Sequence, residues 1–302
     1  MKGASAPSPP GATTRPSDAT RWPAATNCWA PRWRRWSGRR RWSRPVSEVK
    51  ALRDLSYATV DGVDLCLDLY LPATADPVLV VYAHGGGFQF GDKSDAESTR
   101  LRGLASRGVA VASINYRHAP RYLFPAQLDD MKAAVRWLRA NGGGYGLSTE
   151  RIGVWGASAG GYLASMAALD ADPSSAVQAA VIWFAPADLA SSGARSPLER
   201  QIMFPPFEAA VLGLADVAGA PAASSVLVRA AGAVGGPPFL IAHGDRDRMV
   251  PPSESAALHD ALGRAGVRST LLSVAGAGHE DPAFDRPEML ALTAAWLDSV
   301  LR

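Results

Sequence analysis

The sequence predicts an α/β protein with a mainly parallel central sheet flanked by helices. Apolar runs of strand length alternate with longer segments of helical period along most of the chain, and this alternation is typical of βαβ units. Residues 78–83 (VLVVYA) are apolar throughout, as expected for a parallel strand covered on both faces. The chain has 302 residues, 47% of them hydrophobic and 20% charged, which is enough material for one large core.

The first expected element is a β-hairpin, because residues 55–60 and 63–71 flank Asp61-Gly62, a strong hairpin-turn signal. Further buried strands are expected at 78–83, 109–114, 152–155, 180–184, 239–242 and 270–274. Segments of helical character are 96–107, 125–141, 159–169, 253–262 and 287–301. Residues 190–236 are interrupted by Ala, Gly and Pro, so we expect a small, loop-rich lid there, inserted into a single domain that spans 48–302.

Residues 1–47 differ in composition from the rest. They hold ten of the 31 Lys and Arg, five tryptophans and one acid, and their prolines interrupt any regular period. We expect a disordered basic extension, or a translation start placed too far upstream, rather than a tail that binds anionic membrane or nucleic acid. The remainder carries 21 basic and 27 acidic side chains, so the net charge of +3 does not indicate a nucleic-acid surface on it.

Three further signals bear on location and cofactors. No apolar stretch resembles a secretory signal or approaches the ~18 residues that span a bilayer, so we expect a cytoplasmic protein without a membrane partner. The two cysteines, Cys28 and Cys66, have no metal-ligand spacing and suggest no disulfide framework. Neither G-x-x-x-x-G-K nor H-E-x-x-H occurs, and no cofactor is expected.

Ser158 lies in a glycine-rich turn between a predicted strand and a predicted helix. G-x-S-x-G at such a turn is the nucleophile-elbow pattern, in which the serine adopts a strained backbone conformation. Gly156 and Gly160 are needed because side chains at these positions would block the reversal of the chain. The motif alone is a weak signal in a chain rich in Gly, Ala and Ser, and a turn without chemical role is the alternative interpretation.

Polar motifs follow four of the predicted strands. They are His84-Gly-Gly-Gly87, Ser158, His243-Gly-Asp-Arg-Asp247 and His279. The carboxyl ends of parallel strands meet at one edge of a sheet, so we expect these four motifs to lie close together. The order serine, acid, histidine along the chain is that of the α/β-hydrolases.

From about Leu52 onward the chain therefore resembles the α/β-hydrolase superfamily. Within it, the four motifs resemble the H-G-G-G esterase/lipase group, which includes hormone-sensitive-lipase-like and acetyl-xylan/feruloyl-type carboxylesterases. The resemblance implies a serine carboxylesterase that hydrolyses short-chain acyl esters, with carbohydrate acetyl and feruloyl esters among the candidates, as a monomer or homodimer. Residues 1–47 depart from the pattern of members that build a helical cap from their N-terminal segment.

The resemblance also implies a role for each motif. Ser158 is the expected nucleophile and His279 the base that removes its proton. An acid behind the histidine fixes its tautomer, and Asp247 matches the H-G-x-x-D position better than Asp245. The oxyanion hole is expected from three backbone N–H groups, those of Gly86, Gly87 and Ala159.

Other polar residues near these motifs receive structural interpretations. We expect His84 to brace the glycine loop by hydrogen bonds, Asp188 to cap a helix, and Glu280 to be a solvated neighbour. His118 and His259 are expected at the surface. The walls of the substrate pocket are expected from Phe88, Phe90 and residues 190–236, including Met203, Phe204, Pro205, Pro206 and Phe207.

Two other functions fit parts of the pattern. A prolyl-oligopeptidase-like serine peptidase would suit Trp155-Gly-Ala-Ser-Ala-Gly-Gly-Tyr162, although that family usually carries a large N-terminal domain that residues 1–47 cannot supply. A hydrolase-fold receptor would bind a small ligand without catalysis. Such proteins lose a triad member, usually the histidine, whereas this chain keeps all three.

Overall fold

The computed structural model describes residues 48–192 and 206–302. These residues form an eight-stranded sheet with the order β1-β2-β4-β3-β5-β6-β7-β8. Strand β2 is antiparallel to β1 and β4, and all later neighbours are parallel, which confirms the predicted α/β class. The strands are β1 (Val49–Val60), β2 (Val63–Pro72), β3 (Val78–Ala83), β4 (Val109–Ile114), β5 (Ile152–Ala157), β6 (Ala179–Trp183), β7 (Phe239–Gly244) and β8 (Ser269–Val274).

The expected hairpin is present. Asp61 and Gly62 both have positive φ, 52° and 74°, which is the backbone that a two-residue turn matched to the strand twist requires. Strand β1 begins earlier than predicted because Val49 already pairs with Pro72, at the far end of β2.

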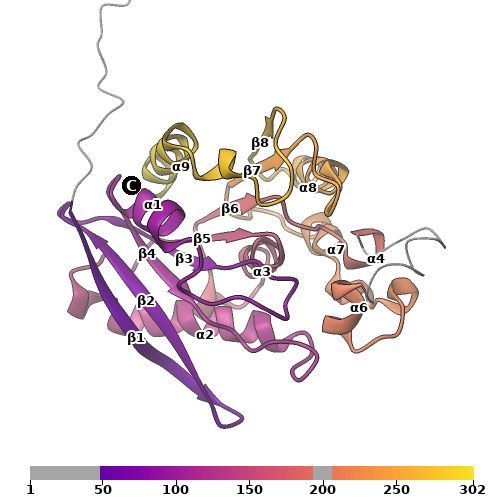
Figure 1. Cartoon of the computed structure of the whole chain (residues 1–302), viewed down its shortest axis with the longest axis horizontal. Helices are drawn as coiled ribbons and strands as arrows, with labels where there is room; N and C mark the ends of the chain where they lie inside the picture. The colour runs from indigo at the N-terminus through magenta and orange to yellow at the C-terminus, as the bar shows by residue number, and fades with distance from the viewer. Residues whose placement is uncertain (1–47, 193–205) are drawn as a thin grey trace, which may run out of the picture. The chain divides into compact units, whose positions relative to one another are not determined.

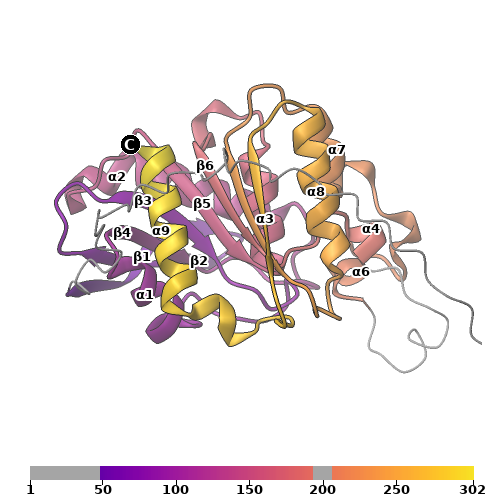
Figure 2. The same ribbon diagram turned by 90° about the horizontal axis from the view of Figure 1, so that it is seen from above.

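Helices cover both faces of the sheet (Figures 1 and 2). One face carries α1 (Arg102–Ala105) and α9 (Pro287–Leu301). The other carries α2 (Ala126–Asn141), α3 (Ala159–Ala168), α7 (Val226–Ala231) and α8 (Pro252–Arg264). Side chains of β3 alternate between the two cores: Leu79 and Val81 belong to one, Val80 and Tyr82 to the other. This period of two explains why an apolar run is needed at a strand covered on both sides.

Two expected segments are irregular, and only the first of them is more so than the sequence suggests. The helix-like segment 96–107 is a π-helical turn, Glu97–Leu101, followed by the single turn of α1. The described part of 190–236 holds only short helical elements: the end of α4 (Leu189–Ser192), α6 (Phe207–Leu212), α7, and 3-10 turns at Val217–Gly219 and Ala222–Ser224. Residues 1–47 and 193–205 lie outside the described residues. None of the described helices is long and apolar enough to cross a membrane.

The carboxyl ends of the central strands meet at one edge of the sheet. Ala83 pairs with Gly156, Ala157 pairs with Trp183, and Gly244 pairs with Val274. The loops that follow these residues carry the four polar motifs. The prediction that the motifs gather at one edge is confirmed.

Candidate active site

Ser158 lies at the tight turn between β5 and α3. Its φ of 52° and ψ of −122° are strained for a residue with a side chain, which costs roughly 1–3 kcal/mol. The turn is pinned by a 2.9 Å hydrogen bond from the Ser158 N–H to the Trp183 carbonyl. A Cβ at Gly156 would lie 2.1 Å from the Gly160 carbonyl oxygen, and one at Gly160 would lie 2.0 Å from that of Ala83. The predicted need for both glycines is confirmed.

The structure brings Ser158, His279 and Asp247 into one hydrogen-bonded chain. Nε2 of His279 lies 2.9 Å from the Ser158 Oγ, and Nδ1 lies 2.7 Å from Oδ2 of Asp247. Since a carboxylate only accepts, Nδ1 carries the ring hydrogen. Nε2 is therefore the free lone pair that can accept the serine proton. The arrangement can activate a hydroxyl as a nucleophile.

Asp247 is held as a buried carboxylate. Its side chain is fully buried, and its Oδ1 accepts the N–H groups of Met249 and Val250 at 2.9 and 3.0 Å. Burial alone would raise its pKa, but hydrogen bonds from His243 and His279 hold the pKa of this carboxyl well below its usual range. The group therefore stays ionised behind His279 at neutral pH.

His243 is a site residue that the sequence analysis did not single out. Its Nε2 lies 3.2 Å from Oδ2 of Asp247 and 3.0 Å from the Val250 carbonyl, so Nε2 is a donor. Its Nδ1 accepts from the Ser255 hydroxyl at 2.7 Å. The histidine of H-G-x-x-D thus orients the acid, and its position in that motif was the available signal.

Asp245 points elsewhere. Its Oδ1 accepts the Gly276 N–H at 2.7 Å and ties the loop after β7 to the loop after β8, on the exposed side. The structure brings Asp247, and not Asp245, to His279.

The glycine loop after β3 lies beside the elbow. Gly86 and Gly87 have φ of 102° and 58°, and the Gly86 carbonyl accepts the N–H groups of Gln89 and Phe90 at 3.0 Å. Within the described residues, the N–H groups of Gly86, Gly87 and Ala159 donate to no acceptor. These three donors are available for an external oxygen.

A family comparison identifies the group to which this site belongs. A family model described as BD-FAE matches residues 67–262, which is more than half of the chain. The chain belongs to the BD-FAE family of α/β-hydrolases. The resemblance to the H-G-G-G esterase group that the motifs suggested is confirmed.

Named relatives of this BD-FAE family member are ester hydrolases. It is 32% identical over 229 residues to the esterase LipQ of Mycobacterium tuberculosis, with 71% of this chain and 52% of that protein covered. It is 38% identical over 128 residues to an ethyl acetate hydrolase of Pseudomonas putida, and the match covers 41% of this chain and 40% of that protein. A thermophilic esterase from Thermogutta terrifontis, solved with propionate bound, is 28% identical and superposes with a TM-score of 0.65. The match covers 85% of this chain and 95% of that one. The chain spans about half the length of the curated relatives it matches.

His84 braces the glycine loop of this BD-FAE family member, as predicted. Its Nδ1 donates to the Gly85 carbonyl at 2.7 Å, and its ring stacks on Tyr116, whose hydroxyl donates to the His84 carbonyl at 3.0 Å. Burial lowers the pKa of His84 to about 4, so the ring is neutral at neutral pH. His118 was expected at the surface, and this is wrong: its ring is half-buried, edge-on to His84, with a buried Nε2. His259 is also half-buried, with its Nδ1 2.7 Å from the Ser269 hydroxyl.

The aromatic residues near the site divide into core and wall. Phe88 is buried edge-on against Tyr162, so its expected place in the pocket wall is wrong. Phe90 is 62% exposed, and its ring lies 6.3 Å from that of Phe207. A Cβ at Gly87 would lie 2.6 Å from the Phe207 ring, so this ring lies directly against the glycine loop. The expected wall residues Met203, Phe204 and Pro205 lie outside the described residues.

Two acidic residues near the site have structural partners. Asp188 accepts the Ala190 N–H at 3.0 Å and caps α4, as predicted. Glu280 is exposed, as predicted, but it also has a partner that the sequence did not indicate. Its Oε2 lies 3.0 Å from a guanidinium nitrogen of the buried Arg100.

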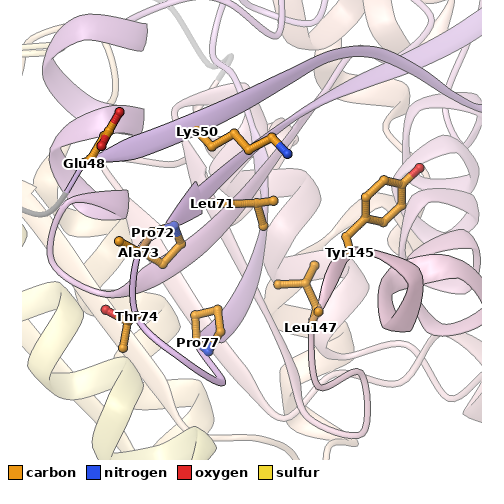
Figure 3. Close-up of a pocket in the computed structure, with 10 residues that line it drawn as sticks. Glu48, Lys50, Leu71, Pro72, Ala73, Thr74, Pro77, Tyr145 and Leu147 are labelled. Atoms are coloured by element: carbon orange, nitrogen blue, oxygen red, sulfur yellow. The ribbon is translucent and has the colours of Figure 1, made fainter.

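Two cavities lie at opposite edges of the sheet. One of about 320 Å³ adjoins the glycine loop and is lined by Tyr82, His84, Gly85, Gly86, Asp95, Ala96, Arg100 and Glu280. The other, of about 350 Å³, is shown in Figure 3 and is lined by residues that include Leu71, Pro77, Tyr145 and Leu147. Pro77 and Leu147 precede β3 and β5, so this second cavity is at the amino edge, away from Ser158. Among the described residues, no cluster of His, Cys, Asp or Glu is arranged for a metal ion.

Proposed function

We propose that the chain is a serine carboxylesterase with Ser158 as nucleophile, His279 as general base and acid, and Asp247 as the supporting carboxylate. The observation that carries the proposal is the position of His279, which bridges the Ser158 Oγ and Asp247 Oδ2 at 2.9 and 2.7 Å. The names of the relatives support ester hydrolysis as the reaction class.

In acylation, the Ser158 Oγ attacks the ester carbonyl carbon while His279 Nε2 takes the hydroxyl proton. The carbonyl oxygen becomes an oxyanion, and the N–H groups of Gly86, Gly87 and Ala159 are the donors proposed to receive it. When the tetrahedral intermediate collapses, the C–O bond to the alcohol breaks and His279 protonates the leaving oxygen. In deacylation, water attacks the acyl-enzyme carbonyl while His279 takes its proton. The bond to Ser158 then breaks, His279 returns the proton to the serine oxygen, and the carboxylic acid leaves.

The substrates that the site supports best are esters of short acyl groups. Phe207 lies against Gly87, one of the proposed oxyanion donors, and a bulky ring at this place shortens the space beside the reacting carbonyl. Each methylene that a pocket accommodates gains only ~0.8 kcal/mol, which does not offset a steric overlap. We propose acyl groups of about two to six carbons, with carbohydrate acetyl and feruloyl esters as natural candidates. A cytoplasmic location and a monomeric or homodimeric state stay predictions from the sequence.

The experiment uses the full chain with p-nitrophenyl acetate and with a fluorophosphonate label. Wild-type protein should hydrolyse the ester, and the label should be found by mass spectrometry on Ser158. Ser158→Ala should lose both and keep its thermal unfolding midpoint. A label on another residue would overturn the assignment. Hydrolysis of a prolyl p-nitroanilide in preference to the ester would favour the peptidase alternative, and binding without turnover the receptor alternative.

A further inference from the structure

Arg100 is a buried arginine, and each of its three guanidinium nitrogens donates a hydrogen bond. The residue is 3% exposed and lies in the π-helical turn just before α1. Its Nε donates to Asp285 at 2.7 Å, its Nη2 to Glu280 at 3.0 Å, and its Nη1 to the Tyr82 hydroxyl at 3.0 Å. The catalytic scheme above gives none of these groups a role.

The two carboxylates that Arg100 binds belong to the segment that follows His279. Glu280 is the next residue, and Asp285 ends the short 3-10 turn Pro282–Asp285. The guanidinium therefore fixes this segment at two points from a part of the chain that is 180 positions away. In Figure 1, α1, which begins two residues after Arg100, lies beside α9, which begins two residues after Asp285.

The aromatic rings next to the Arg100 guanidinium also belong to residues of the site. The Cζ atom of Arg100 lies 5.3 Å from the centre of the Trp183 ring and 6.0 Å from that of the Phe184 ring. The Trp183 carbonyl receives the N–H of Ser158, and the Phe184 ring meets the His279 ring edge-on at 5.1 Å. Arg100 thus packs on the residues that support both the serine and the histidine.

Glu280 links the histidine segment to the glycine loop. Its φ of 51° is a left-handed conformation that a residue with a side chain adopts only at a cost. While Oε2 pairs with Arg100, Oε1 lies only 2.9 Å from the position of a Cβ at Gly85. The carboxylate therefore lies against the first glycine of the loop that holds two of the three proposed oxyanion donors.

We propose that Arg100 is a positioning residue that acts through Glu280 and keeps His279 and the Gly85–Gly87 loop in register with Ser158 during turnover. The inference rests on the proposed esterase function. An ion pair that buries one of its two charges is a poor source of net stability, because desolvation of the buried charge offsets the attraction. We therefore expect the pair to matter for the positions of the site residues, since a displacement of about 1 Å in an active site can reduce the rate roughly 100-fold.

The test measures kcat and KM on p-nitrophenyl acetate, with functional sites counted by a fluorophosphonate label. The variants are Glu280→Gln, Arg100→Lys, Arg100→Met and the double variant Arg100→Met/Glu280→Gln. We expect kcat per labelled site to fall about 10- to 100-fold in Glu280→Gln and Arg100→Met, with KM little changed and partial rescue in Arg100→Lys. The double variant should be no slower than Arg100→Met alone, because both changes break one linkage.

Arg102→Met is the matched control. Arg102 is two residues along, and its polar and ring partners among the described residues are Glu97 at 2.8 Å, the Val49 carbonyl and the Tyr70 ring, so the kcat of this variant should equal that of wild type. If Arg100→Met does not fold, Glu280→Gln still tests the inference. This variant should fold, because the Glu280 side chain is 43% exposed and glutamine has the same shape. If wild type is inactive and unlabelled, the proposed function fails. If wild type is active but Glu280→Gln keeps full kcat per labelled site, or if the effects of the two substitutions add, this inference is wrong.

Discussion

Nε2 of His243 lies 3.2 Å from Oδ2 of Asp247, the same carboxylate oxygen that receives the hydrogen bond of His279. Two histidines therefore share one buried oxygen, and the backbone N–H groups of Met249 and Val250 hold the other. A carboxylate with this many donors has one orientation. This explains how a loop residue can fix the tautomer of a histidine 32 positions away.

Asp247→Asn should reduce kcat by roughly 10⁴, because an amide at this place no longer favours the tautomer with Nδ1–H or stabilises the imidazolium. Asp245→Asn is the matched control, since among the described residues its exposed carboxylate accepts only from the Gly276 N–H. Steady-state kinetics on p-nitrophenyl acetate checks both. If Asp245→Asn were the slower variant, the supporting acid would be Asp245.

The stability of the protein should depend on pH through His84. Burial lowers the pKa of His84 to about 4 in the folded chain, against about 6.5 in the unfolded chain. Between these values the unfolded chain binds more protons, so the free energy of unfolding should be greatest above pH 6.5 and fall by up to about 3 kcal/mol toward pH 4. Urea unfolding at several pH values measures this slope.

His84→Asn should flatten that slope, because its amide can still donate to the Gly85 carbonyl but does not titrate. His259→Asn is the control, since His259 is half-buried and its one hydrogen-bond partner in the described part of the chain is the Ser269 hydroxyl. A slope in His84→Asn as steep as that of wild type would show that other groups carry the pH dependence.

Gly160→Ala should abolish ester hydrolysis and destabilise the fold. The added Cβ would lie 2.0 Å from the Ala83 carbonyl oxygen and 2.4 Å from that of His84, and neither backbone atom can move without shifting β3. Gly143→Ala is the control, because nothing lies within 4 Å of a Cβ there. Thermal unfolding and activity should distinguish the two variants. Normal activity in Gly160→Ala would contradict the tight elbow.

Phe207→Ala should shift the preferred acyl chain to greater length, since the ring against Gly87 is the described wall beside the proposed oxyanion donors. The measurement is kcat/KM across p-nitrophenyl esters from acetate to palmitate for wild type, Phe207→Ala and the surface control Leu292→Ala. Wild type should be most active between two and about six acyl carbons. A wild-type maximum at dodecanoate or beyond would refute the proposal that Phe207 limits the acyl pocket to short chains, and would indicate a lipase.

Removal of residues 1–47 should leave kcat and the unfolding midpoint nearly unchanged. Every side chain in the proposed catalytic scheme lies within 48–302, and the composition of 1–47 offers no amphipathic face. The measurement compares the full chain with a variant that starts at Glu48. A large loss of activity or stability would mean that the segment packs on the domain.

Much of the fold could be predicted because its signals are local. The apolar run of β3 and the Asp61-Gly62 turn each specify their element within a few residues. The order of the polar motifs then placed Ser158, Asp247 and His279 at one edge, because parallel strands end together. The start of β1 was missed because its pairing with β2, and not its own pattern, decides it.

The sequence by itself determined which residues are candidates for the proposed chemistry: a strained serine between two obligatory glycines, a histidine after the last strand, and donors in a glycine loop. Only the tertiary structure decided how they are held. It buried Phe88 while leaving Phe90 exposed, and it paired Glu280 with Arg100. The physical reason is distance along the chain. Motifs act within a few residues, whereas an ion pair that spans 180 positions exists only after the sheet has formed.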